Sequence, residues 1–143
     1  MFNFTSLIRE SLANNATIKG LFNAALTGSC RVTLSELALS GAYPQILLDY
    51  VGGQTIPGMD GEQGRLYIRV ESQGSGSEHA IKNLGWFKSA ILNVLDENNL
   101  SATATIYHLR KTNETGCRYD EDNKCYFNTL MFDTWVKQNH NIP

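Results

Sequence analysis

The sequence predicts an α+β fold, in which one long helix and short N-terminal helices pack on a mixed or mostly antiparallel sheet of four to five strands. Residues 77–99 place apolar side chains at helical spacing, which gives a stripe broad enough to cover a sheet. Residues 65–71 alternate between apolar and polar, as in a strand with one wet face. The chain has 143 residues, of which 42% are hydrophobic and 18% charged, and this indicates a single domain over residues 1–143.

The N-terminal residues 1–28 are expected to form two short helices. Residues 4–14 carry four apolar residues on one side, and two asparagines interrupt the pattern. Thr17 can cap the second helix, which Gly28 ends. Residues 31–34 then read as a short strand.

The middle of the chain alternates strands with glycine-rich segments. Residues 44–51 are apolar on both faces, so we expect a strand that is covered on both sides. Residues 52–64 contain five glycines and a proline, which predicts a long loop before the strand at 65–71. The helix at 77–99 follows, with Ser77 as a suitable N-cap. Its apolar stripe consists of Ile81, Leu84, Phe87, Ile91, Leu92, Val94 and Leu95.

Beyond the helix, residues 102–111 and 125–137 read as strands, joined by a polar tip at 112–124. The strands at 65–71 and 102–111 form a right-handed crossover through the helix if they share a sheet in parallel. The neighbouring strands add by hairpins. We expect the tail at 138–143 to be loose.

Composition limits the function. The formal net charge of −2 argues against a dedicated nucleic-acid binder, although DNA can pass through an acidic ring without binding. No run approaches the ~18 apolar residues of a membrane span, and the N-terminus lacks a secretory signal pattern. The three cysteines, Cys30, Cys117 and Cys125, read as free thiols.

The motifs for chemistry are weak. The glycine-rich segment 52–64 lacks the Lys-Ser/Thr ending of a phosphate-binding loop. His108, Cys117 and Cys125 can approach one another in a hairpin, but the spacing of the two cysteines matches no standard zinc site. No serine sits in a Gly-x-Ser-x-Gly elbow. We therefore expect no catalytic residues, no cofactor and no metal, and the chain is not expected to be an enzyme.

Exposed aromatic residues point to interfaces instead. Trp86 falls on the polar side of the long helix, beside Lys82 and Ser89. Either the N-terminal helices cover Trp86, or it contacts another subunit or a partner. Met59 and Tyr119 sit near the tips of the segments 52–64 and 112–124, which we expect to reach a neighbour and become ordered on contact.

The order of these elements resembles that of the tail-terminator, or tail-completion, proteins of long-tailed bacteriophages. The resemblance starts with S-L-I-R-E-S-L-A-N-N-A-T-I-K-G-L-F-N-A-A-L-T-G-S-C-R-V and continues with Y-P-Q-I-L-L-D-Y-V and L-Y-I-R-V-E. It extends through the helix A-I-K-N-L-G-W-F-K-S-A-I-L-N-V-L to the closing hairpin, Y-D-E-D-N-K followed by Y-F-N-T-L-M-F-D. It is a likeness of pattern over nearly the whole chain, with no ligand motif.

The resemblance implies a small virion subunit, assembled in the host cytoplasm, whose copies close into a six-membered ring. Such a ring caps the head-proximal end of the tail tube, stops tube growth and joins the tail to the head connector. Its partners are copies of itself, the tail tube protein and neck proteins, and no membrane is involved. The glycine-rich segment 52–64 and the pair Cys117 and Cys125 depart from the pattern.

Two alternatives stay open. One is another ring of the phage neck or head-completion group. The other is a monomeric metal- or ligand-binding module, with its site in segment 52–64 or at His108, Cys117 and Cys125.

Overall fold

The computed structural model describes residues 4–25, 31–35, 43–55, 58, 61–72, 77–95 and 104–138. They form helices and strands in nearly the predicted order, with one additional short strand, β5. The elements are α1 Phe4–Ala13, α2 Ala16–Ala25, β1 Val32–Leu34, β2 Gln45–Gln54, β3 Glu62–Ser72, α3 Ser77–Val94, β4 Ala104–Glu114, β5 Arg118–Asp120 and β6 Cys125–Gln138. The expected end of α2 at Gly28, the helix beyond Leu95 and the tail after Gln138 lie outside the described residues.

The described strands form one six-stranded sheet in the order β1-β2-β3-β6-β4, with β5 also paired to β6. β1 and β2 run parallel, and the other pairs are antiparallel. The α+β prediction is therefore confirmed, with one strand more than expected. β6 lies between β3 and β4 and is antiparallel to both, so β3 and β4 run parallel with one strand between them.

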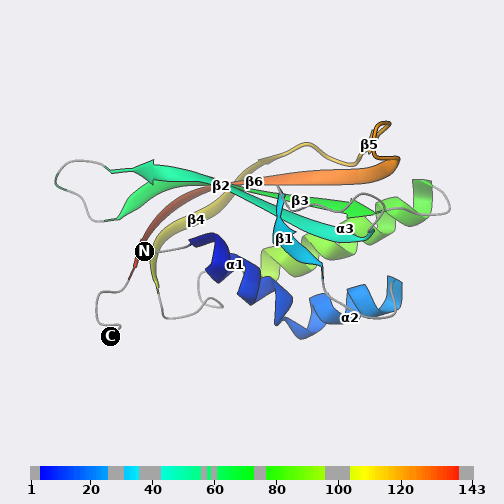
Figure 1. The fold of residues 1–143 in the computed structure, drawn as a ribbon, viewed down its shortest axis with the longest axis horizontal. Helices are drawn as coiled ribbons and strands as arrows, with labels where there is room; N and C mark the ends of the chain where they lie inside the picture. The colour runs from blue at the N-terminus through cyan, green and yellow to red at the C-terminus, as the bar shows by residue number, and fades with distance from the viewer. Residues whose placement is uncertain are drawn as a thin grey trace.

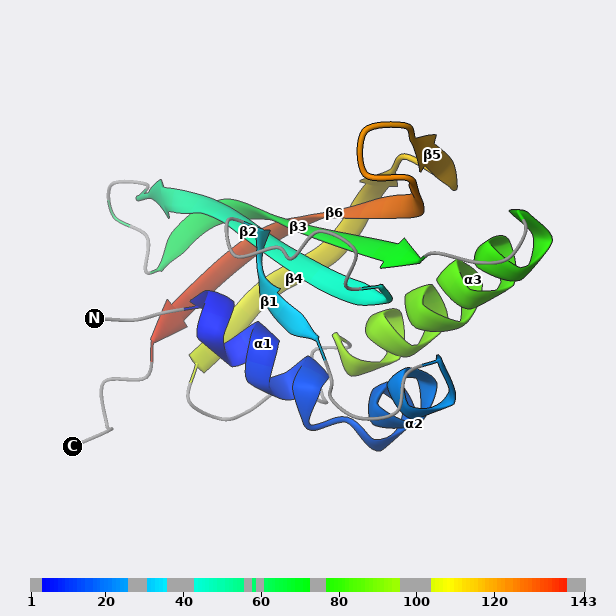
Figure 2. The same cartoon turned by 45° about the vertical axis from the view of Figure 1, so that its right-hand side comes forward.

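Helices and sheet form two layers. In both views α1, α2 and α3 lie on the same side of the sheet (Figure 1 and Figure 2). The buried apolar residues gather between the layers, and rings from α2 and α3, Phe22 and Phe87, meet edge to face at 5.1 Å. We call the other side of the sheet the open face, because none of the described helices lies on it.

The N-terminal helices bury the predicted sides. In α1 the buried residues are Phe4, Leu7, Ile8 and Leu12. The prediction that Thr17 caps α2 is wrong: the side-chain oxygen Oδ1 of Asn15 accepts the backbone N–H of Ile18 at 3.1 Å. Asn15 precedes the first helical residue, which is the position where a side-chain acceptor satisfies a free N–H. Among the helices described, none has the length and apolar character to span a membrane.

The expectation that β2 is covered on both faces holds for its first half. Ile46, Leu47 and Leu48 are buried, whereas Asp49 is exposed and Val51 is 61% exposed. The apolar run therefore extends past the part of the strand that neighbouring elements cover.

The expected loop at 52–64 is much shorter than predicted, because β2 continues to Gln54 and β3 begins at Glu62. Gly52 and Gly64 lie against the ring of Tyr50, where a Cβ atom on Gly64 would come within 2.7 Å of the hydroxyl. Gly53 has φ +94° at a shift in strand register. These glycines provide room for a ring and a bulge inside strands, rather than marking a loop.

Helix α3 packs on the sheet with most of the predicted stripe, but the placement of Ile81 in that stripe is wrong. Ile81 is 51% exposed, whereas Leu84, Phe87 and Ile91 are buried. At about 100° per residue, Ile81 lies roughly 80° around the helix from Ile91, beyond the edge of the buried arc.

Candidate interface surfaces

The structure does not bring the candidate metal ligands together. His108 of β4 pairs with Trp135, whereas Cys125 begins β6 and pairs with Asp120. Ten residues of β6 separate these two places, or about 33 Å at ~3.3 Å per residue. Cys117 is exposed, and burial raises the pKa of both Cys117 and Cys125, which disfavours the thiolate that a metal requires.

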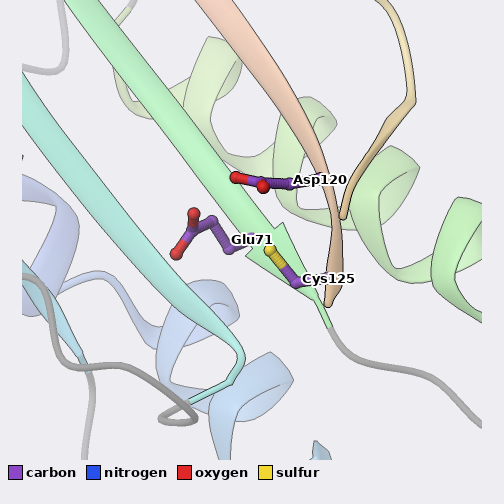
Figure 3. A group of neighbouring side chains, drawn as sticks. All are labelled: Glu71, Asp120 and Cys125. Atoms are coloured by element: carbon purple, nitrogen blue, oxygen red, sulfur yellow. The ribbon is translucent and has the colours of Figure 1, made fainter. Parts of the chain in front are cut away.

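A different cluster forms where β3, β5 and β6 meet. One ligand atom each from Glu71, Asp120 and Cys125 lies within 4.8 Å of the others (Figure 3). Arg69 already bridges the two carboxylates: its Nε donates to Glu71 and its Nη2 to Asp120, both at 2.8 Å. The Arg69 guanidinium also lies 3.9 Å from the ring centroid of Phe127. The cluster is therefore an ion-paired joint between strands, in which the Arg69 guanidinium is the cation between the two carboxylates.

This joint holds the tip between β5 and β6 in a fixed shape. Oδ1 of Asp120 accepts the backbone N–H groups of Asp122 and Asn123, and the bonds from Asn123 are the main cause that lowers the pKa of Asp120. The hydroxyl of Tyr43 donates to the carbonyl of Asn123 at 3.0 Å. The expectation that 112–124 orders only on contact is wrong, because β4, β5 and this turn are ordered within the chain.

Tyr119 keeps the exposed position that the sequence suggested. It is 50% exposed and rests edge-on against Tyr126, with ring centroids 4.9 Å apart. The tip therefore presents a half-exposed ring on a preformed support. Met59, the matching candidate in the other segment, lies outside the described residues.

Glu114 joins α3 to the end of β4. Its Oε1 receives Lys88 of α3 and Lys111 of β4, each at 2.6 Å, and its Oε2 accepts from Asn128 at 2.9 Å. These bonds, led by the one from Lys111, lower the pKa of Glu114 to about 2. The carboxylate stays charged at neutral pH and fixes the helix relative to the sheet.

The open face carries a groove of about 670 Å³ across β2, β3, β6 and β4. Its lining is Val51, Gly52, Gln63, Gly64, Arg65, Tyr67, His108, Asp133, Thr134 and Trp135. Arg65 and Asp133 face each other across β3 and β6 at 3.6 Å. The alternation at 65–71 predicted that Arg65 and Tyr67 lie on the polar face of their strand, as they do, but the sequence did not predict the groove because it depends on the order of the strands.

Trp86 is 53% exposed, so the alternative that the N-terminal helices cover it is wrong. Helix α2 contacts a different side of α3, through Phe22 and Phe87. Ile81 also lies on the exposed part of α3, and Lys82 and Glu78 form an exposed pair there at 3.6 Å. We call the exposed residues Glu78, Ile81, Lys82 and Trp86 the α3 patch.

The fold is similar to a known one. A chain in the solved structure of the virion of a native gene transfer agent particle superposes with a TM-score of 0.67. The two share 16% sequence identity, and the match covers 93% of each chain. Nothing in the curated proteins matches this sequence, and no protein-family model matches it either.

Proposed function

We propose that this chain is a structural protein of a phage-like virion. One observation carries the proposal, which is the likeness to a chain of the gene transfer agent virion over 93% of both chains. A match of that extent leaves only about 7% of either chain outside it. It agrees with the pattern of elements, which resembles that of phage tail terminators.

The finer proposal is that the copies close into a six-membered ring at the head-proximal end of the tail tube. Such a ring stops tube growth because its far side differs from the surface that recruits the next tube ring. Tube, connector and neighbouring copies then need separate contact surfaces on one subunit. The half-exposed residues Trp86 and Tyr119 lie on different elements and support that division.

The role we propose is geometric, with no reaction and no cofactor. Ring closure follows from head-to-tail contacts between copies. A net charge of −2 suits a lumen through which DNA passes, because acidic walls repel phosphates.

Electron microscopy of tails assembled with and without the protein tests this role. With the protein present, we expect tubes of uniform length that carry labelled protein at one end. Without it, tubes should grow to irregular lengths. Uniform tubes in its absence would reject tail termination, and label on another ring of the neck would move the protein to that position.

A further inference from the structure

We propose that Trp86 of one copy inserts into the open-face groove of the next copy, so that the α3 patch and the groove form the contact between subunits. This inference rests on the proposed ring and names the surfaces that build it. The occupant is a second copy of this chain, and the contact is heterologous, since one subunit supplies the helix and the other the sheet.

The two surfaces lie on opposite layers of the molecule. The α3 patch belongs to α3, in the helical layer (Figure 2). The groove residues Arg65, Tyr67 and Asp133 alternate along β3 and β6 with the buried residues, so the groove is on the open face of the sheet. A head-to-tail contact requires two different patches, each left free when the other is occupied. A chain with both patches on one face would instead favour a closed two-fold dimer.

The groove has room for an indole ring and offers aromatic side chains beside polar ones. Its volume of about 670 Å³ is within the ~300–1,000 Å³ typical of ligand pockets. Tyr67, His108 and Trp135 supply ring surfaces that an aromatic side chain can pack against. A tryptophan that enters such a pocket and loses its water is the usual form of an interface hot spot.

Charges at the rims complement each other. The α3 patch carries Glu78 and Lys82, and the groove carries Arg65 and Asp133. Within one copy, Lys82 pairs with Glu78 and Arg65 pairs with Asp133. In each pair the nitrogen and oxygen are 3.6 Å apart, which is long for an ion pair, and both side chains are largely exposed. Such pairs contribute little to the fold, so they can exchange partners across an interface, Lys82 with Asp133 and Glu78 with Arg65.

The edge of the sheet formed by β4 is a poorer contact. No strand within the described residues pairs with the outer edge of β4, but β4 contains two register shifts, between Ile106 and His108 and between Lys111 and Asn113. Bulges bend an edge strand and oppose its pairing with another chain. The β4 edge is therefore protected, whereas the groove is accessible.

Analytical ultracentrifugation of the full chain, at concentrations up to about 1 mM, tests the contact. A dissociation constant above about 1 mM would be too weak for a specific complex between subunits. We expect the wild type to associate beyond dimers. Trp86→Ala should weaken association about 30-fold or more. Tyr119→Ala is the matched control, because it removes an equally exposed ring outside both surfaces, and it should associate like the wild type.

Mixing two defective copies identifies a heterologous contact. Trp86→Ala keeps its groove, and Tyr67→Ala keeps its Trp86, so their equimolar mixture should form a 1:1 heterodimer and nothing larger. Circular dichroism shows whether Tyr67→Ala folds. If it does not, Asp133→Lys replaces it, and adding Lys82→Glu to Asp133→Lys should restore association.

Several results would overturn the contact. They are a wild type that remains monomeric at about 1 mM, a Trp86→Ala variant that associates normally, and a mixture that builds large rings. Each is independent of the tail-termination test. A monomer that still caps tubes rejects this contact alone, and a ring that never binds tubes rejects the proposed function alone.

Discussion

Replacing Glu114 with glutamine should destabilise the protein at neutral pH and leave its stability unchanged in strong acid. The pKa of Glu114 is lowered from its ordinary 4.5 to about 2 by Lys111, Lys88 and Asn128. At about 1.36 kcal/mol for each pKa unit, the difference of about 2.5 corresponds to roughly 3.4 kcal/mol as an upper bound. The Glu114 side chain is 23% exposed and Lys88 33%, so solvent screening reduces the expected loss to about 1–2 kcal/mol.

The sign follows from linkage. A carboxyl group with a lowered pKa in the folded state stabilises the fold above its unfolded pKa, and this contribution is lost as the pH falls from about 4.5 to about 2. Urea unfolding followed by circular dichroism at several pH values measures it. The wild type and Glu114→Gln should differ at pH 7 and converge near pH 2.

The exposed carboxylate Glu121 provides the control. Glu121→Gln should change the free energy of unfolding by no more than about 0.5 kcal/mol at any pH. The reasoning would be refuted if Glu114→Gln had the same free energy of unfolding as the wild type at pH 7. It would also be refuted if the variant were less stable by the same amount at every pH.

Four further substitutions test the packing and the buried ion pair. Phe87→Ala should cost about 3–5 kcal/mol of unfolding free energy, whereas Trp86→Ala costs no more than about 0.5 kcal/mol, and thermal unfolding separates them. Gly64→Ala should cost about 1–3 kcal/mol because its Cβ would meet the Tyr50 ring, and urea unfolding should show a smaller penalty in a Tyr50→Leu background. Arg69→Met should cost about 3–5 kcal/mol by leaving the buried Glu71 without its cation, and adding Glu71→Gln should recover part of that loss.

The periodic spacing of apolar residues predicted most of the fold correctly. The alternation at 65–71 placed Leu66, Ile68 and Val70 on the buried face, and the structure confirms all three. The helical spacing of α3 also placed Trp86 outside the buried stripe, where the structure has it. These predictions hold because each depends on residues close together in sequence.

The errors share a different cause. Gly64 reads as a loop residue until the ring of Tyr50, 14 residues away, is seen against it. The tip at 112–124 reads as mobile until Arg69 on β3 is found paired with Asp120. Both depend on contacts between distant segments, and local composition does not record them.

The candidate surfaces also differ in whether local sequence pattern predicts them. Trp86 and Tyr119 were identified from local pattern, since each is a large ring where its neighbours are polar. The groove brings four strands together, and a prediction of it requires β6 to be inserted between β3 and β4. The alternative site at His108, Cys117 and Cys125 is not formed for the same reason, because spacing in sequence does not give the register of β4 against β6.

Electron cryomicroscopy of tail tubes assembled in the presence of this protein tests the proposed virion role most directly. We predict a ring at one end of each tube whose density fits this fold, with α3 of each copy against the sheet of the next. Bare tube ends, with the protein left in solution under conditions that yield complete tails, would contradict it.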